Sequence, residues 1–470
     1  MTDLCFRTAR EMAAMLRRRE ISARELVQAH LDRIDAVNPQ VNAVVTLVPE
    51  RALAEADAAD ARLLAGEPLG PLHGIPMAHK DTHSTAGIRT TSGSPLLADF
   101  VPDADELVIE RIRAAGAITL GKTNVPEFAA GSHTFNPVFG ATHNPYDLER
   151  SAGGSSGGAA AALACGMHPL ADGSDMGGSL RNPASFNNVV GLRPAPGRVP
   201  TYPSALAFST MGVQGPMART VGDAALLLSV MAGPDPRCPI GIDVPGSIFD
   251  VPLERDLTGL RVAWTSDLGG RVPVDDEVTA ALKPQVRVFS ELGAHVEEAF
   301  PDLRGADEVF RTLRAWQFAA AFGPLLERHR DTLKDTLVAN TEEGLALTGP
   351  DVARAEMLHG VLFERMREFF TRFDVLLLPV SQVVPFEVGI EFPKEVAGVA
   401  QPSYLDWMAS AYLISATGHP AISVPAGFTP GGLPVGMQMV GGHRGELELL
   451  KVAEAFERAT RCGERRPPFV

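Results

Sequence analysis

The chain has 470 residues, of which 45% are hydrophobic and 21% charged, and its formal net charge is −15. This composition is typical of a soluble protein with a large core, and the acidic balance argues against a nucleic-acid groove or an anionic membrane surface as the main partner. The four cysteines have no Cys-x-x-Cys spacing, and neither a signal peptide nor a membrane-spanning run is apparent, so we expect a cytoplasmic protein with reduced thiols.

The N-terminal part of the chain predicts helices followed by a strand-helix arrangement. Two helices are expected between residues 8 and 37, with Ser22 and Glu25 forming a capping box at the start of the second. The further expected elements are a strand at 41–48, a helix at 50–65, a helix at 105–115 and a strand at 117–120. Between them, GPLHGIPMAHKD (70–81) leads from turn residues into a short apolar run that ends in charge.

The rest of the chain continues to alternate. Strands are expected at 189–192, 260–264, near 295–300, and at 374–380, 421–427 and 433–441. Helices are expected from Thr220 to 231, at 275–292, over most of 306–370, near 404–416 and at 446–459. This alternation predicts an α/β fold in which helices cover both faces of a mixed central sheet. Because no repeat or linker divides the chain, we expect a single domain over residues 1–470.

Residues 153–184 contain two serine-glycine clusters around a run of small apolar residues. Glycines just before Ser179 could aim consecutive backbone N–H groups into an anion-binding concavity. A hydroxyl beside such a concavity supplies a nucleophile and oxyanion donors, two of the parts of an acyl-transfer site. A flexible linker or a phosphate-binding turn are the alternatives, although the apolar run and the absence of a Gly-Lys-Ser/Thr motif count against them.

A serine nucleophile needs a base, and the sequence offers two residue types. Most of the 12 histidines lie in positions that predict ordinary structural roles. His79 and His83 have a spacing of zinc ligands, but no convincing helix carries them and no glutamate lies between them, so no metal site is predicted. Lys80 ends an apolar run, and a lysine acts as a base only where burial lowers its pKa; from its residue type alone, an ordinary surface position is the simpler interpretation.

These segments together resemble the amidase signature family of serine amidohydrolases. The resemblance rests on Gly-Gly-Ser-Ser-Gly-Gly at 153–158 and on Gly173-x-Asp175-x-Gly177-x-Ser179-Leu180-Arg181-x-Pro183-Ala184. It is extended by 70–81, GKTNVPEF (121–128), VVGLRPAPGRVP (189–200) and the segments within 419–441. It implies N-terminal helices at 1–69, a catalytic signature core at 70–230, and the remaining sheet and substrate-pocket helices at 231–470.

The family's chemistry implies a role for each matching residue and requires no cofactor. Ser179 is the expected nucleophile, Ser155 a bridging serine after a cis peptide bond, and Lys80 the neutral base. The expected oxyanion hole consists of backbone N–H groups of Met176, Gly177, Gly178 and Ser179. The supporting residues are expected to be Gly154, Ser174, Asp175 and Arg181. Ala129, Gly131 and Ser132 are expected near the substrate, together with helical residues of 306–410 such as Trp316, Phe318, Phe322 and Trp407, although aromatic residues at helical spacing more often belong to a core.

The resemblance implies hydrolysis of a small-molecule carboxylic amide, with no nucleic acid or membrane as partner; homodimers are frequent among relatives. The residues at 174, 176, 182 and 187–188, and His79, depart from the commoner family pattern, which leaves the acyl group undefined. Three alternatives remain open: an α/β-hydrolase-like esterase using Gly-x-Ser155-x-Gly, the glutaminase subunit of a tRNA-dependent amidotransferase, and a non-enzymatic binding protein. The esterase needs a strand directly before Ser155, where residues 143–150 instead predict a loop.

Overall fold

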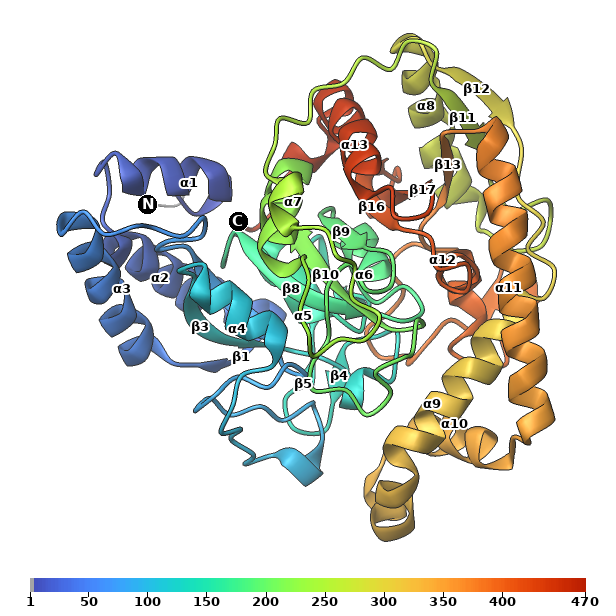
Figure 1. The fold of residues 1–470 in the computed structure, drawn as a ribbon, viewed down its shortest axis with the longest axis horizontal. Helices are drawn as coiled ribbons and strands as arrows, with labels where there is room; N and C mark the ends of the chain where they lie inside the picture. The colour runs from blue at the N-terminus through green and yellow to red at the C-terminus, as the bar shows by residue number, and fades with distance from the viewer. Residues whose placement is uncertain (1–3) are drawn as a thin grey trace.

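A mixed sheet runs through the centre of the molecule in the computed structural model, which describes residues 4–470 (Figure 1). Its 11 strands have the order β1-β3-β2-β8-β10-β9-β16-β17-β13-β11-β12. The strands are β1 (Val44–Leu47), β2 (Pro76–Lys80), β3 (Ile118–Thr123), β8 (Leu170–Asp175), β9 (Val190–Arg193), β10 (Val213–Ala218), β11 (Arg261–Trp264), β12 (His295–Glu298), β13 (Val375–Pro379), β16 (Ala421–Phe428) and β17 (Pro434–Gly441). Strand β2 is parallel to β3 and β8, and β11 is parallel to β12 and β13. The pairs between these two groups are antiparallel, and so is the edge pair β1–β3.

Helices surround this sheet. They are α1 (Ala9–Arg17), α2 (Ala23–Val41), α3 (Pro49–Leu64), α4 (Leu107–Ala114), α5 (Gly157–Ala164), α6 (Arg181–Phe186), α7 (Val221–Met231), α8 (Asp276–Glu291), α9 (Ala306–His329), α10 (Asp335–Ala346), α11 (Gly349–Arg372), α12 (Ala409–Ser415) and α13 (Glu446–Thr460). The Ser22–Glu25 capping box and the Thr220 cap are both present. The predicted α/β architecture is therefore confirmed, including the long helical stretch that follows residue 306.

The two faces of the central strands pack against different helices. Successive side chains of a strand point to opposite faces, and Leu170 and Ala218 accordingly join the large core that contains α7 and α13. Their neighbours Ala171 and Met217 join a smaller core with residues of α5 and α6. The sheet is thus covered on both sides, as predicted.

Glycines let the region around Ser179 approach the sheet closely. A Cβ atom at Gly191 or Gly215 would lie 2.3 Å from a backbone oxygen, and one at Gly173 would lie 2.6 Å from the Leu180 side chain. On β17, a Cβ at Gly436 would meet Ser185 of α6 at 2.8 Å. Absence of side chains at these positions brings α6 and the loop before it directly onto the strands.

The expectation of a loop at residues 143–150 is wrong. Strands β6 (His143–Asn144) and β7 (Asp147–Ser151) form a separate two-stranded sheet there. The sequence does not predict these strands because they are polar. They lie outside the central sheet and do not need apolar side chains on both faces. Two further pairs of short strands, β4 (Phe135–Asn136) with β5 (Gly140–Ala141) and β14 (Glu395–Val396) with β15 (Val399–Ala400), also lie outside it.

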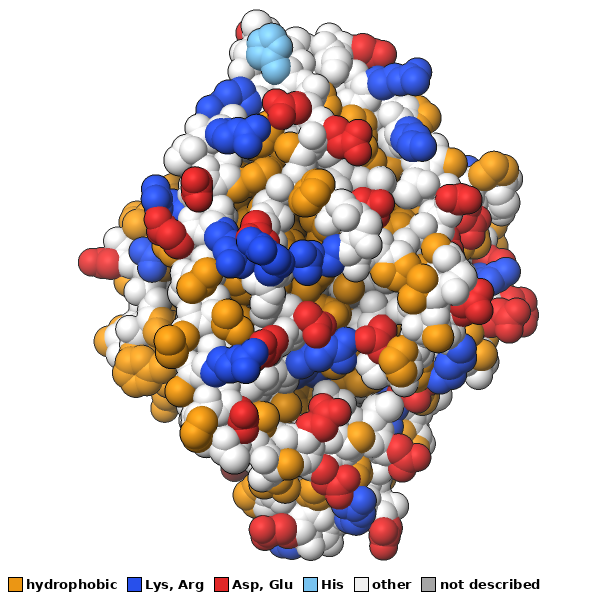
Figure 2. All heavy atoms as spheres, turned by 90° about the vertical axis from the view of Figure 1, so that its right-hand side faces the viewer, with side chains coloured by type: hydrophobic (Ala, Val, Ile, Leu, Met, Phe, Trp, Pro, Cys, Tyr) orange, Lys and Arg blue, Asp and Glu red, His pale blue; other side chains and the backbone are white. Residues whose placement is uncertain are grey.

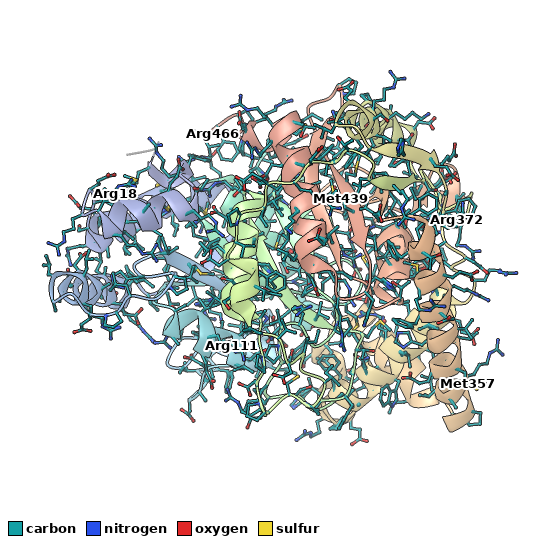
Figure 3. All side chains as sticks on the ribbon, turned by 45° about the horizontal axis from the view of Figure 1, so that its top comes forward. Arg18, Arg111, Met357, Arg372, Met439 and Arg466 are labelled. Atoms are coloured by element: carbon teal, nitrogen blue, oxygen red, sulfur yellow. The ribbon has the colours of Figure 1, made fainter. Side chains whose placement is uncertain are left out.

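The surface of the molecule mixes charges of both signs. On the face shown in Figure 2, Lys and Arg side chains are interspersed with Asp and Glu and with apolar side chains. Figure 3 shows Met439 of β17 in the interior, whereas Arg18 and Arg372 lie at the periphery. Within residues 4–470, no helix has the length and apolar character needed to cross a bilayer.

The close contact of α5 with the end of β3 generates a stability prediction. A Cβ at Gly158 would lie 2.3 Å from the backbone N of Asn124 and 2.7 Å from the backbone O of Ala43. Gly158→Ala should therefore destabilise the fold by about 1–3 kcal/mol and lower the melting temperature, because the backbone must move. Gly222→Ala in α7 is the matched control, since its Cβ meets no atom within 4 Å; it should leave stability unchanged or raise it by up to about 1 kcal/mol. Equal melting temperatures for the two variants would contradict the close packing.

Candidate active site

Lys80 ends strand β2 inside the protein, surrounded by hydroxyl groups. Its side chain is fully buried, and its Nζ lies 2.8 Å from Ser155 Oγ, 2.9 Å from Ser156 Oγ and 2.9 Å from Ser174 Oγ. The simpler interpretation as a surface lysine is thereby excluded. Strand β2 pairs with β3 and β8 on its two sides, and the first turn of α5 follows the two serines directly.

The environment of Lys80 favours a neutral amine. Burial lowers its pKa to about 7, despite the opposing effect of the negative charges on Asp175 and Asp172. A protonated lysine has three donors and no acceptor, whereas a neutral amine has two donors and one lone pair. Three hydroxyl neighbours satisfy the neutral form if two of them accept hydrogen bonds and one donates. A group of this kind is suited to take up a proton near neutral pH.

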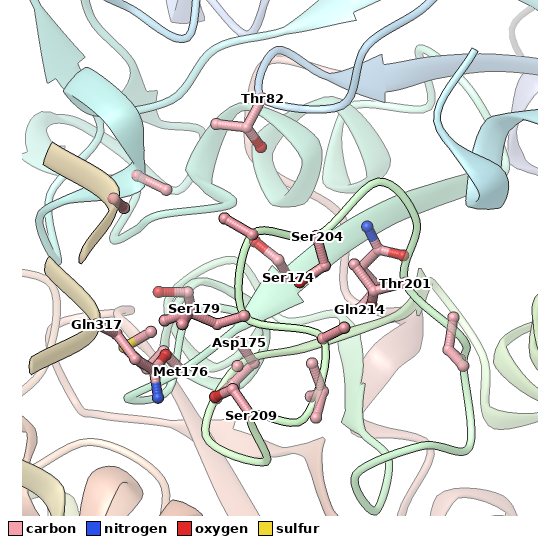
Figure 4. A pocket seen from close by; sticks show the side chains of 18 of the residues that line it. Thr82, Ser174, Asp175, Met176, Ser179, Thr201, Ser204, Ser209, Gln214 and Gln317 are labelled. Atoms are coloured by element: carbon pink, nitrogen blue, oxygen red, sulfur yellow. The ribbon is translucent and has the colours of Figure 1, made fainter. Parts of the chain in front are cut away.

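Ser155 and Ser179 both line a cavity of about 430 Å³. The peptide bond between Gly154 and Ser155 is cis, as the resemblance implies. The backbone N–H of Ser156 donates to the Ser179 carbonyl oxygen at 3.2 Å, which fixes the two serine segments side by side. Within residues 4–470, no hydrogen bond involves the Ser179 hydroxyl. Figure 4 shows Ser174, Asp175, Met176 and Ser179 grouped in the cavity, with Gln317 on one side and Gln214 on the other.

Asp175 holds the segment that carries Ser179. Its Oδ1 accepts from the Gly178 N–H at 2.9 Å and its Oδ2 from the Leu180 N–H at 3.1 Å. Arg181 forms a two-point ion pair with the same carboxylate, and Arg193 adds a longer contact at 3.3 Å. Burial alone raises the pKa of Asp175, but the charges of Arg181 and Arg193 hold it well below its ordinary value. The carboxylate is therefore ionised and fixes the loop.

The expected oxyanion donors are only partly free. The Gly178 N–H is already donated to Asp175. The N–H groups of Met176 and Gly177 have no acceptor in the part of the chain that the structure describes, and both residues directly precede the Asp175-bound turn. Two unpaired N–H groups at the edge of a cavity are suited to hold a developing negative charge on oxygen.

His79 and His83 both contact one buried carboxylate. Both Nδ1 atoms lie 2.6 Å from oxygens of Asp172 on β8, and His79 Nε2 lies 3.1 Å from Thr119 Oγ1. The Lys80 N–H also donates to Asp172 at 3.2 Å, so this carboxylate fixes the end of β2. Sequence reasoning missed Asp172, although a charged residue inside an otherwise apolar strand was a usable signal.

The structure places the remaining predicted residues in different surroundings. Ala129 lines the cavity, as do Phe318 and Phe322. Gly131 and Ser132 are not among its lining residues, and the Ser132 hydroxyl accepts instead from the Trp407 indole at 2.9 Å, inside the core. Arg181 and Asp175 form the ion pair described above, and the Ser174 hydroxyl lies 2.9 Å from Lys80 Nζ. Sequence reasoning missed a set of lining residues from an irregular loop: Gly197, Val199, Thr201, Ser204, Ala205, Leu206, Ala207, Ser209 and Gly212. Arg314 and Gln317 of α9 also line the cavity; they lie in the helical segment expected there but were not singled out.

Comparisons with known proteins match this chain to one family over almost its full length. The Amidase family model matches residues 25–450. An acylamidase of Rhodococcus erythropolis is 38% identical, with 99% of this chain and 98% of the relative covered. A glutamyl-tRNA(Gln) amidotransferase subunit from Moorella thermoacetica is also 38% identical, with 99% of each covered. A solved bacterial aryl acylamidase of the amidase signature family superimposes with a TM-score of 0.91 at 32% identity over 98% of each chain.

The mixed sheet, the buried lysine and the paired serines thus occur in a chain that these relatives match from end to end. The protein belongs to the amidase signature family. It is an amide-hydrolysing enzyme.

The Asp175 network generates a second stability prediction. Asp175→Asn leaves Arg181 and Arg193 buried without a carboxylate, which should cost about 3–5 kcal/mol and lower the melting temperature strongly. Glu364→Gln is the control, because it removes an exposed ion pair with Arg367 and should leave the melting temperature unchanged. If the melting temperature of Asp175→Asn equals that of the wild type, the carboxylate does not have the structural role assigned to it.

Proposed function

We propose that this enzyme hydrolyses a small-molecule carboxylic amide through an acyl-enzyme on Ser179, with Ser155 as the proton bridge and neutral Lys80 as the base. The observation that carries the proposal is the fully buried Lys80 amine, with its lowered pKa, 2.8 Å from Ser155 Oγ. The products are a carboxylate and ammonia or an amine.

The proton path follows from the hydroxyl chain. As Ser179 Oγ attacks the amide carbon, its proton passes to Ser155 Oγ while the Ser155 proton passes to Lys80 Nζ. The reverse transfer delivers a proton to the leaving nitrogen, so that the C–N bond breaks without expelling an amide anion. Water then attacks the acyl-enzyme, and the same chain carries its proton. The base is regenerated neutral at the end of the cycle.

The negative charge on the former carbonyl oxygen needs donors that are in place beforehand. We assign this role to the backbone N–H groups of Met176 and Gly177, with that of Ser179 beside them, because Gly178 is engaged by Asp175. Asp175 therefore acts as a positioning residue: it holds the turn, and the turn presents the donors.

A second candidate function is the glutaminase subunit of a tRNA-dependent amidotransferase. Identity of 38% to one such protein favours it as much as the equal identity to the acylamidase favours a free-standing amidase. The departures from the family pattern around residues 176–188 support the free-standing enzyme. The test is an activity assay of the purified protein alone. Hydrolysis of simple amides at full rate without added subunits or RNA would show that it is a free-standing amidase.

The nucleophile is tested with a fluorophosphonate probe and peptide mapping. We expect one adduct, on Ser179, and none in Ser179→Ala. Lys80→Ala should slow labelling by at least about 100-fold because no base remains to take the proton. Ser247, an exposed serine in a separate part of the chain, provides the control: Ser247→Ala should label as wild type. An adduct on Ser155 would instead favour the esterase reaction.

The lowered pKa of Lys80 predicts the pH dependence of hydrolysis. Only the neutral amine accepts a proton, so kcat/KM should fall about tenfold per pH unit below a pKa near 7 and level off above it. The measurement is kcat/KM between pH 5 and pH 9 on a neutral amide, whose own charge stays constant. A constant rate across this range would exclude Lys80 as the base.

A further inference from the structure

One buried arginine beside the catalytic cavity has no carboxylate partner. Among residues 4–470, four arginine side chains are buried: Arg181, Arg193, Arg198 and Arg314. The first two pair with Asp175 and the third pairs with Glu446 at 2.9 Å. Arg314, on α9, forms no ion pair with any residue of the described range 4–470.

The neighbours of the Arg314 guanidinium are polar or aromatic, but neutral. Its Nε donates to Asn340 Oδ1 at 3.2 Å, one terminal nitrogen lies 3.2 Å from Met176 Sδ, and the other donates to the Tyr404 hydroxyl. The Phe318 ring lies under the guanidinium at 4.0 Å. These contacts orient the group and satisfy part of its hydrogen bonding, yet they leave its positive charge uncompensated.

The open side of Arg314 is the cavity that Ser179 shares. Two carboxylates, those of Asp175 and Glu106, also line this cavity, and neither forms an ion pair with Arg314. Asp175 is held by Arg181 and Arg193, and Glu106 accepts from the Gln214 amide. A buried cation is costly unless an anion approaches it. The missing anion can therefore enter only from the cavity, as part of a bound molecule.

We propose that Arg314 binds a carboxylate carried by the amide substrate, so that the enzyme prefers anionic amides over neutral ones of the same size. This inference rests on the proposed function of the same site. Arg314 is a specificity-determining residue: its guanidinium contacts a remote group of the substrate, and the reacting carbonyl lies at Ser179 and Met176. The apolar walls of Phe128, Phe318 and Phe322 hold the chain that links the two groups.

Two classes of substrate carry a carboxylate a few bonds from the amide. The carboxylate stands on the acyl side in the monoamide of a dicarboxylic acid and on the amine side in an N-acyl amino acid. Succinamate against butanamide tests the first, and N-butanoylglycine against N-propylbutanamide tests the second. In at least one pair, wild-type kcat/KM should favour the anionic member by about 10- to 100-fold, the effect of a charge-assisted hydrogen bond in a desolvated site.

Arg314→Met should abolish that preference while retaining hydrolysis of the neutral member, and Arg314→Lys should restore part of it because the charge remains. Arg328→Met is the matched control, since Arg328 lies exposed on the same helix α9 and its loss should change neither rate. A purely structural Arg314, acting through Met176, would instead lower both rates of a pair by the same factor. That uniform loss overturns the proposal. Wild-type kcat/KM values that are the same for the anionic and the neutral member in both pairs also overturn it. Melting temperatures confirm that each variant is folded.

Binding measured by calorimetry separates this inference from the proposed catalytic role. Ser179→Ala binds substrate without turnover, so the same pairs are titrated into it and into Ser179→Ala/Arg314→Met. We expect tighter binding of an anionic member, by the same 10- to 100-fold, only where Arg314 is present. Hydrolysis by Ser179→Ala would refute the proposed nucleophile and leave the Arg314 comparison intact. Equal affinities, or no binding of either anionic amide, overturn the Arg314 proposal even if Ser179 is the nucleophile.

Discussion

Burial of the Lys80 amine is the physical constraint on which the site depends. Charge on a group removed from water is expensive, so burial brings the pKa of this lysine to about 7 and makes the neutral form accessible. The neutral amine is tolerated because three hydroxyls surround it. Those hydroxyls come from the segment after the cis peptide bond and from the end of β8. The buried Lys80 amine and the serine hydroxyls around it are thus two consequences of one packing arrangement.

Two carboxylates near Lys80, those of Asp172 and Asp175, each hold a different segment in place. Asp172 contacts His79, His83 and the Lys80 backbone, and so fixes the strand end that carries Lys80. Asp175 contacts Arg181, Arg193 and the turn before Ser179, and so fixes the position of that turn. Both raise the pKa of Lys80 through their negative charge, but less than burial lowers it. The two carboxylates therefore make this region rigid without holding Lys80 in its charged form.

The same reasoning separates the two kinds of buried arginine. Arg181 and Arg193 are paired inside the protein and belong to its framework. Arg314 is oriented by neutral groups and lies open to the cavity. The helices after residue 306 thus contribute a charge as well as apolar walls to the cavity. This division is consistent with a reaction that is common to a family and a substrate preference that differs among its members.

The sequence by itself determined the alternation of strands and helices, the capping at Ser22 and Thr220, and the family motifs that contain Lys80, Ser155 and Ser179. Local propensity and a long motif suffice for these, because they depend on residues close together in the chain. Only the tertiary structure decided that Lys80 is buried, that Gly178 is occupied by Asp175, and that Ser132 faces the core. It also revealed the β6–β7 hairpin, the Asp172 cluster and the unpaired charge of Arg314. Each of these depends on which groups distant in sequence come into contact and on how much water they exclude, and a pattern of residue types does not contain that information.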